Sequence, residues 1–271
     1  MKTLFITGAS SGIGRETVKY FQTKGWNVAA TMRNPSKETE LTQLANVECF
    51  PLEVTDVDSI RQAIADAISA FGSIDVLCNN AGFSVVGAFE ATNQEQIERQ
   101  FAVNFTGTLN VMREVLPYFK QKKAGAIINL ASIGAELGFP LYSIYNASKF
   151  AVAGFTEAVS YEMDLYNIRM RCIEPGIIKT DFYTRSYNLA YDEKLKEIND
   201  FYIGDAKEKI AGYGADGSDP VLIAKLIYKA ANSKSKKLIY RAGRYSFLPI
   251  LRQILPFGLL KALIRNNYKV S

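Results

Sequence analysis

Residues 7–14 read Thr-Gly-Ala-Ser-Ser-Gly-Ile-Gly, between a short apolar run at residues 4–6 and a helix-like stretch at residues 15–24. A strand that turns through glycines into a helix forms a phosphate site. The glycines let a ligand approach the backbone, and the helix N-terminus presents free N–H groups and a partial positive charge. The stretch predicts dinucleotide binding, although its spacing, G-x-x-x-G-x-G, leaves a tight turn without a ligand as an alternative.

Composition narrows the possible classes of protein. The 271 residues are 48% hydrophobic, which allows a sizeable core, and the net charge of +5 is too diffuse to argue for nucleic acid. The absence of histidine excludes Ser-His-Asp triads, Cys-His pairs and histidine metal sites, so we expect no metal. The three cysteines are expected as buried, reduced thiols: Cys49, Cys78 and Cys172.

Apolar, β-branched runs alternate with helical patterns along the chain. We predict strands at Thr3–Thr7, Asn27–Met32, Val47–Pro51, Ile74–Asn79, Ala126–Ala131, Arg169–Glu174 and Lys237–Tyr240. Helical stretches include Val57–Phe71, Gln94–Phe119, Tyr145–Leu165 and Pro220–Ala231, and Lys122, Lys123 and Gly125 are expected to close the long middle helix with a left-handed cap. The alternation predicts a single-domain α/β, Rossmann-like, doubly wound fold with a mostly seven-stranded parallel sheet and helices on both faces.

The second predicted strand ends at Met32 and is followed by Arg33. NAD-binding folds usually place a carboxylate here to accept a hydrogen bond from the ribose 2′-hydroxyl. Met32 cannot accept that bond, whereas Arg33 could bind a 2′-phosphate through charge-assisted hydrogen bonds. We therefore predict NADP rather than NAD as the cofactor, with an ordinary exposed arginine at a strand end as the alternative.

Tyr145 and Lys149 are four residues apart on a predicted helix and therefore share one face. A free tyrosine has a pKa of about 10, and a neighbouring ammonium lowers it by stabilising the phenolate. The predicted strand at 126–131 delivers Ser132 to the same edge of the sheet, where its hydroxyl could bind a substrate oxygen. The pair is a candidate proton donor and acceptor, and the alternatives are a solvated helix face for the pair and a turn residue for Ser132.

The Tyr-x-x-x-Lys spacing is a weak signal by itself, because it also occurs at Tyr20/Lys24 and at Tyr118/Lys122. Those two pairs fall late in their helices, next to turns that lead into strand N-termini. The pair that begins at Tyr145 instead opens its helix at the carboxyl edge of the sheet, where ligands bind in such folds.

The motifs above and three others follow one another over roughly residues 1–240. In chain order they are Thr7–Gly14, Asn79-Asn80-Ala81-Gly82, Asn104 within Val103–Gly107, Ser132, Tyr145-x-x-x-Lys149 and Pro175-Gly176-Ile177-Ile178-Lys179-Thr180. In this order and spacing they resemble the short-chain dehydrogenase/reductase family. The resemblance implies hydride transfer between a nicotinamide and a substrate carbon.

The resemblance also implies roles for four catalytic residues. Tyr145 would exchange a proton with the substrate oxygen, and Ser132 would hydrogen-bond that oxygen. Lys149 would bind the nicotinamide ribose and lower the pKa of Tyr145, while Asn104 would hold a water behind Lys149. Expected cofactor contacts, including those of the glycine turn, are Gly8, Ser10, Ser11, Gly12, Ile13, Gly14, Arg33, Glu53, Val54, Asn80, Ala81, Gly82, Lys149, Ile178 and Thr180. The family usually has Asp at the adenine contact where this chain has Glu53.

Nearly forty residues, about 181–219, separate Thr180 from the helix expected at Pro220, and loops of this length are usually functional lids. The lid carries Phe182, Tyr183, Tyr187, Leu189, Tyr191, Phe201, Tyr202, Ile203 and Tyr213, and the facing wall is expected to hold Phe83, Val85, Val86, Phe139, Leu141 and Tyr142. Apolar walls favour an apolar carbonyl or alcohol substrate, such as a steroid, retinoid, fatty-acyl or aromatic compound. The alternative is that these side chains only pack the lid shut.

We expect residues 1–245 to form the dinucleotide-binding and catalytic domain, and residues 246–271 an amphipathic extension. The apolar positions of the extension are Phe247, Ile250, Leu251, Ile254, Phe257, Leu260, Leu263 and Ile264, its basic ones are Arg252, Lys261, Arg265 and Lys269, and Pro249 and Pro256 break it. A basic amphipathic tail can lie on a membrane surface, although such helices more often cover their own domain or a partner.

The leading hypothesis is an NADP-dependent oxidoreductase that interconverts a carbonyl and a secondary alcohol. The alternatives are a non-catalytic NADP-binding redox sensor or scaffold and a peripheral membrane enzyme that acts on lipid carbonyls. The complete catalytic set favours an enzyme, because a pure binder needs no acid–base group. The short N-terminal apolar run and the lack of a spanning segment lead us to expect a cytoplasmic protein, and the family resemblance a homodimer or homotetramer.

Overall fold

The computed structural model describes residues 1–184, 186–199, 212 and 214–268. Parallel strands form a seven-stranded sheet in the order β3-β2-β1-β4-β6-β7-β9. The strands are β1 (Thr3–Ile6), β2 (Asn27–Met32), β3 (Val47–Pro51), β4 (Val76–Asn79), β6 (Gly125–Leu130), β7 (Ile168–Pro175) and β9 (Ile239–Ala242). The predicted α/β fold with a seven-stranded parallel sheet is confirmed, because each predicted strand overlaps one of these.

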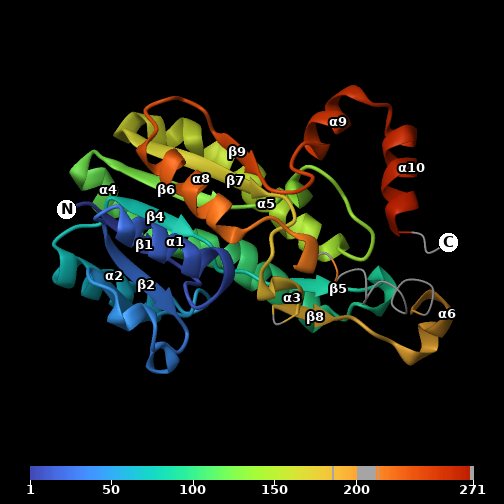
Figure 1. The fold of residues 1–271 in the computed structure, drawn as a ribbon, viewed down its shortest axis with the longest axis horizontal. Helices are drawn as coiled ribbons and strands as arrows, with labels where there is room; N and C mark the ends of the chain where they lie inside the picture. Colours follow the sequence, from blue (N-terminus) through green and yellow to red (C-terminus); the bar gives the residue numbers. More distant parts are fainter. Residues whose placement is uncertain (185, 200–211, 213, 269–271) are drawn as a thin grey trace.

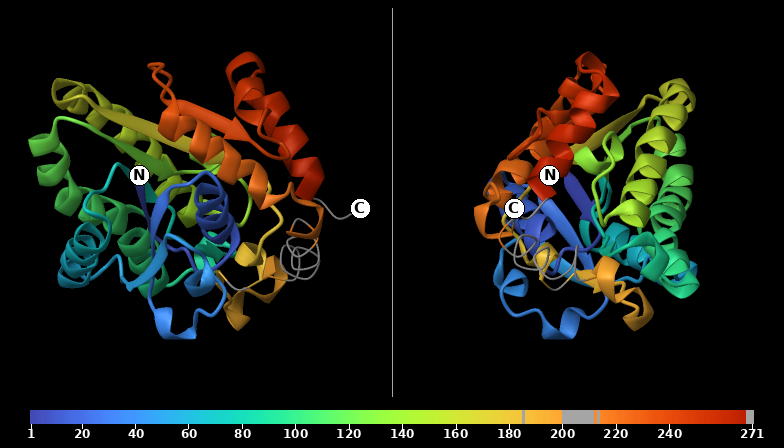
Figure 2. Two further views of the ribbon diagram at one scale, coloured as in Figure 1. Left: turned by 60° about the vertical axis from the view of Figure 1, so that its left-hand side comes forward. Right: turned by 90° about the vertical axis from the view of Figure 1, so that its right-hand side faces the viewer.

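Helices cover both faces of the sheet (Figures 1 and 2). One face carries α1 (Gly12–Thr23) and α8 (Pro220–Asn232), and the other carries α2 (Val57–Phe71), α4 (Gly107–Lys122) and α5 (Ser143–Met163). Side chains alternate between the faces along each strand, so Leu4 and Ile6 pack with Phe21 of α1, while Phe5 packs with Ile60 of α2. The strands are therefore buried on both sides, as their near-continuous apolar runs predict.

The helical stretch expected at Gln94–Phe119 is interrupted. Helix α3 (Gln94–Phe101) passes into a π-helical turn at Ala102–Thr106 before α4 begins. The left-handed residue that ends α4 is Lys123, with φ 51°. Gly125 instead opens β6, where a Cβ would lie 2.6 Å from the ring of Phe119.

The lid region expected at residues 181–219 is only partly described. Its strand β8 (Tyr187–Leu189) pairs in parallel with β5 (Ser84–Val86), and a short helix, α6 (Lys196–Asn199), follows. The predicted lid residues Phe201, Tyr202, Ile203 and Tyr213 lie outside the described residues. The lid is therefore held to the body of the protein at its first third by main-chain pairing.

The C-terminal extension forms α9 (Leu248–Ile254) and α10 (Phe257–Tyr268), which are separated at Pro256. Pro249 does not interrupt a helix, because it occupies the first turn of α9, where its missing N–H costs nothing. None of the helices in residues 1–184, 186–199, 212 and 214–268 is both long and apolar enough to cross a bilayer.

The turn between β1 and α1 depends on glycine. Gly8 and Gly12 adopt left-handed conformations, with φ 67° and φ 53°. A Cβ on Gly14 would overlap the carbonyl oxygen of Gly8 and lie 2.6 Å from the side-chain amide of Asn80. Gly14 therefore allows α1 to start directly against the backbone of the turn.

We predict opposite effects for two helical glycine-to-alanine substitutions. Gly14→Ala should lower the free energy of unfolding by about 2 kcal/mol or more, because the backbone must shift to admit the methyl group. Gly154→Ala in α5, where a Cβ meets nothing within 4 Å, should raise it by about 0.5–1 kcal/mol through helix propensity. Urea unfolding of both variants measures the difference, and equal effects would contradict the packing argument.

Candidate active site

A cavity of about 810 Å³ lies at the carboxyl edge of the sheet, where the strand order reverses between β1 and β4. This is the position at which doubly wound sheets bind ligands. The predicted site residues that line it are Gly8, Ser10, Ser11, Gly12, Ile13, Arg33, Glu53, Val54, Asn80, Ala81, Gly82, Ser132, Tyr145, Lys149, Ile178 and Thr180. The cavity thus brings the glycine turn and the candidate proton donor into one space, whereas Gly14 and Asn104 lie behind its wall.

The N-terminus of α1 opens toward this cavity without a side-chain cap. Ser11 at the N-cap makes no capping hydrogen bond, and no acidic residue lies in the first turn. By contrast, Asp56, Asn93 and Asp219 cap the N-termini of α2, α3 and α8. The free N–H groups and the helix dipole of α1 therefore suit an anion such as the phosphates of a dinucleotide.

Asn80 fixes the glycine turn against the end of β4. Its side-chain amide donates hydrogen bonds of 2.9 Å to the carbonyls of both Thr7 and Gly8. The Thr7 hydroxyl in turn accepts from the backbone N–H groups of Asn80 and Ala81. These contacts explain why an asparagine and a threonine accompany the glycines, a link that local sequence patterns do not show.

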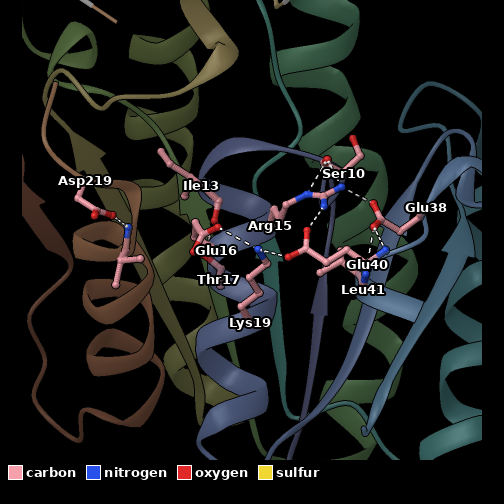
Figure 3. A network of polar contacts seen from close by, with 11 residues as sticks. Ser10, Ile13, Arg15, Glu16, Thr17, Lys19, Glu38, Glu40, Leu41 and Asp219 are labelled. Atoms are coloured by element: carbon pink, nitrogen blue, oxygen red, sulfur yellow. Dashed lines mark hydrogen bonds and ion pairs between the residues drawn. The ribbon is translucent and has the colours of Figure 1, made fainter. Parts of the chain in front are cut away.

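A network of ion pairs ties the turn to the segment that follows β2 (Figure 3). The guanidinium of Arg15 donates to the carbonyl of Ser10 and pairs with Glu38 and Glu40 at 2.5 Å each. Lys19 pairs with Glu40 as well, also at 2.5 Å. These two cations are thus engaged by carboxylates.

Arg33 differs from Arg15 and Lys19, which are paired with carboxylates. It is exposed at the end of β2, lines the cavity, and forms no ion pair within the described part of the chain. Its neighbour Met32 is buried and also lines the cavity. A cation therefore stands beside the glycine turn at the position where the sequence analysis expects a ribose phosphate.

Glu53 and Val54 lie at the far end of the cavity, after β3. The carboxylate of Glu53 accepts a hydrogen bond of 3.3 Å from the N–H of Thr55, so Glu53 stabilises the turn in which it lies. Val54 approaches the start of α4 so closely that a Cβ on Gly107 would lie 2.7 Å from its side chain. Contact of Glu53 with an adenine stays a prediction.

Tyr145 and Lys149 project from the first turns of α5, and the Lys149 Nζ lies 5.9 Å from the centre of the Tyr145 ring. The Nζ donates a hydrogen bond of 2.7 Å to the carbonyl of Leu130 at the end of β6. Burial raises the pKa of Tyr145 to about 12, and a hydrogen bond with Ser132 offsets part of this rise. Burial also lowers the pKa of Lys149 to about 8.

Burial dominates the pKa of Tyr145, and the opposing contribution comes from the hydrogen bond with Ser132. The lowering of this pKa by Lys149, which we expect from the sequence, stays a prediction. Burial disfavours the charged form of either group, so it raises the pKa of a phenol and lowers that of an amine. Tyr145 is therefore protonated at neutral pH, as a proton donor to a carbonyl oxygen must be.

Asn104 lies in the π-helical turn and is buried. Its side chain accepts from the N–H of Phe83 and donates to the Phe83 carbonyl, at 3.1 and 2.9 Å, and it also donates to the Ser148 hydroxyl at 3.3 Å. The Ser148 hydroxyl donates to the carbonyl of Tyr145. Asn104 thereby joins a cavity wall to the helix that carries the candidate acid, and its water behind Lys149 stays a prediction.

The other two Tyr-x-x-x-Lys pairs serve the fold. Lys24 lies over the ring of Tyr20 at 5.2 Å. Lys122 pairs with Asp75 at 2.6 Å, and the hydroxyl of Tyr118 accepts a hydrogen bond from Ile74. The distinction drawn from their positions in the sequence therefore agrees with the contacts.

Aromatic side chains form the wall beside Tyr145. The rings of Tyr145 and Phe182 lie 5.8 Å apart, and Tyr183 packs edge-on against Phe182. Of the residues expected on the substrate side, Phe83, Phe182, Tyr183, Tyr187 and Leu189 line the cavity, whereas Val86, Phe139, Leu141 and Tyr142 pack behind it. Sequence reasoning missed Arg99, Ser186 and Asn188, which also line it, because only the α3 and β5–β8 contacts bring them there.

A buried carboxylate supports the floor of the site. Glu174 at the end of β7 is fully buried and accepts a hydrogen bond of 2.6 Å from Arg241 of β9. Arg241 also pairs with Glu136, which follows the turn that begins at Ser132. Burial raises the pKa of Glu174, and Arg241 opposes that rise. Arg241 therefore links the Ser132 loop to two strands.

Known proteins share this sequence and architecture. The family model described as short chain dehydrogenase matches residues 2–188. A 3-ketodihydrosphingosine reductase from Bacteroides thetaiotaomicron is 39% identical over 179 residues, which cover 66% of this chain and 65% of that relative. The uncharacterized oxidoreductase YusZ from Bacillus subtilis is 33% identical, and the alignment covers 98% of both chains.

Solved structures agree. A short-chain dehydrogenase from Streptomyces avermitilis superimposes with a TM-score of 0.82 at 26% identity, over 98% of this chain and 97% of that one. ElxO with NADP bound gives a TM-score of 0.72 at 28% identity, over 89% and 96% of the two chains. The chain belongs to the short-chain dehydrogenase/reductase family and is an oxidoreductase of that family, and these matches do not support the non-catalytic alternative.

We predict that Arg241→Met lowers the free energy of unfolding by about 3 kcal/mol or more, because it leaves the Glu174 carboxylate buried without its partner. Arg244→Met is the matched control, since Arg244 pairs with Asp216 at an exposed site and its loss should have a much smaller effect. Denaturant unfolding measures both values. A small loss for Arg241→Met would show that the buried pair does not hold the floor of the site.

Proposed function

We propose that the protein is an NADP-dependent reductase that converts an apolar ketone or aldehyde to the alcohol, with the reverse oxidation at the same site. The observation that carries this proposal is the single cavity that joins the uncapped start of α1, Arg33, and the Ser132–Tyr145–Lys149 cluster. The residues at the start of α1 would hold the phosphates of a cofactor in this cavity, and Tyr145 and Lys149 would lie at its nicotinamide end.

The residues of the Ser132–Tyr145–Lys149 cluster have separate roles in the reaction. When bound, a reduced nicotinamide would supply a hydride, that is, one proton and two electrons, to the carbonyl carbon. Tyr145 donates its hydroxyl proton to the carbonyl oxygen, so the substrate leaves as an alcohol and Tyr145 becomes a phenolate. Ser132 hydrogen-bonds the same oxygen while negative charge develops on it.

Lys149 stabilises the phenolate that forms. Its pKa of about 8 leaves it mostly protonated at neutral pH, so a positive charge stands near Tyr145 at the moment the phenol loses its proton. Its side chain would also bind the ribose of the nicotinamide half of the cofactor. Burial raises the pKa of Tyr145, so the phenol holds its proton at neutral pH in the resting site and the proton is present for donation.

The charges at the expected ribose site support NADP rather than NAD. Arg15 and Lys19 are paired with Glu38 and Glu40, so the cation left to meet a 2′-phosphate is Arg33. ElxO, a structural neighbour, was solved with NADP bound. The remaining cofactor contacts that we propose are those of the cavity-lining residues expected from the sequence.

The substrate is proposed to be apolar because Phe83, Phe182, Tyr183 and Leu189 line the cavity around Tyr145. The relative from Bacteroides thetaiotaomicron is named for the reduction of a keto compound, 3-ketodihydrosphingosine. A ketone with a long apolar portion is therefore the first class to screen. A homodimer or homotetramer, expected from the family resemblance, and a cytoplasmic location, expected from the sequence, complete the proposal.

We predict that Tyr145→Phe lowers kcat for NADPH-dependent ketone reduction at least about a hundredfold, because the proton donor is lost, while the Kd for NADPH changes little. Tyr20→Phe provides a matched control, since Tyr20 carries the same spacing to a lysine but lies outside the cavity. Steady-state kinetics and fluorescence titration separate the two effects. Full activity of Tyr145→Phe would refute the assignment of the acid.

Cofactor choice gives a second test. Arg33→Ala should raise the Kd for NADPH about tenfold to a hundredfold and change the Kd for NADH little, because NADH has no 2′-phosphate for Arg33 to bind. Titration of both cofactors against both proteins measures the ratio. An equal loss for the two cofactors would mean that Arg33 does not read the 2′-phosphate.

A further inference from the structure

Charge is divided unequally along the chain. Residues 220–271 hold eleven of its 32 lysines and arginines and none of its 27 acidic residues. The mild overall charge of +5 therefore conceals a strongly basic C-terminal fifth attached to an acidic remainder. Arg252, Lys261 and Arg265, on α9 and α10, are all exposed.

Part of the apolar surface of α9 points away from the protein. Phe247, Ile250 and Ile254 are 50–71% exposed, whereas Leu248 and Leu251 are half-buried and Pro249 is buried. A helix that only covers its own domain would bury the exposed three as well. Helix α10 also exposes Phe257 and Leu259, and it rests on the protein through Leu260, which is 1% exposed.

We propose that α9 and α10 form a docking surface for an anionic lipid bilayer. The apolar side chains at 247, 250, 254, 257 and 259 enter the interfacial region, and Arg252, Lys261 and Arg265 bind the anionic headgroups. The helices lie on the bilayer rather than across it, since neither is long enough to span one.

The charge pattern selects a bilayer over a second copy of the chain. Around a twofold axis, the arginines and lysines of α9 and α10 in one copy would face the same cations of the other, with no carboxylate in the whole segment to pair with them. An anionic surface satisfies both the apolar side chains and the surrounding cations. This inference rests on a surface outside the cavity and stands without the proposed activity.

The surface also has a consequence for access to the site. Helices α9 and α10 lie at the end of the molecule toward which the strands point, as do β5 and β8 of the cavity wall (Figures 1 and 2). A protein docked through these helices therefore holds that end of the molecule near the bilayer, from which an apolar substrate can be taken.

Co-sedimentation of the full-length protein with two kinds of vesicle tests the proposal. One kind contains phosphatidylcholine alone, and the other contains phosphatidylcholine with phosphatidylglycerol. We expect binding to the second kind that weakens as salt is raised. Failure of the wild-type protein to bind phosphatidylglycerol vesicles at low salt would overturn the proposal.

Charge variants test the assigned surface. Lys261→Gln with Arg265→Gln should lower the affinity for anionic vesicles about tenfold or more. The matched control is Lys225→Gln with Lys229→Gln on α8, which removes the same charge from another exposed helix and should have a much smaller effect. Equal losses would mean that net charge, rather than this surface, governs binding, and would overturn the proposal.

Apolar variants test insertion and self-association together. Ile250→Ser with Ile254→Ser should reduce vesicle binding at least about tenfold, whereas Leu222→Ser on α8 should leave it unchanged. Thermal unfolding checks that each variant is folded. Gel filtration decides the remaining outcome, since a wild-type oligomer that the Ile250/Ile254 variant dissociates, without vesicle binding by either, would assign the surface to a second copy instead.

Discussion

The close approach of backbone to backbone at the β1–α1 turn is the constraint on which the site depends. Gly14 lies against the carbonyl of Gly8, and Asn80 donates to that carbonyl from the end of β4. The contact fixes where α1 begins relative to the central strands, so its uncapped N–H groups face the cavity. The same few atoms thus set the direction of the helix dipole and the position of the glycine turn in the cavity wall.

Burial then sets the chemistry at the other end of the cavity. Burial raises the pKa of the Tyr145 phenol and lowers the pKa of the Lys149 amine, so Tyr145 keeps its proton and Lys149 loses its proton more readily. Sequence reasoning considered the neighbouring charge alone, whereas the structure adds burial, which raises the pKa of Tyr145. Spacing along a helix gives proximity, but the extent of desolvation depends on distant elements such as the Leu130 carbonyl and the ring of Phe182.

Local sequence patterns were sufficient to predict the sheet and the glycine turn, because hydrophobic periodicity and the conformational preference of glycine act within a few residues. They did not predict the π-helical turn at Asn104, which is stabilised by hydrogen bonds to Phe83 some twenty residues earlier. Nor did they predict the cluster of Glu136, Glu174 and Arg241, whose members come from three separate segments. Such contacts leave no periodic trace in a single sequence.

The parallel pairing of β5 with β8 joins two chain segments about a hundred residues apart into one frame beside the cavity. Gln96 of α3 reinforces that frame by donating to Asn188 and to the Leu189 carbonyl. The side chains of this frame that line the cavity, such as Ser186, Asn188 and Leu189, can therefore be exchanged while the frame keeps its register. Selectivity for different guests can diverge at these positions without disturbing the reacting groups.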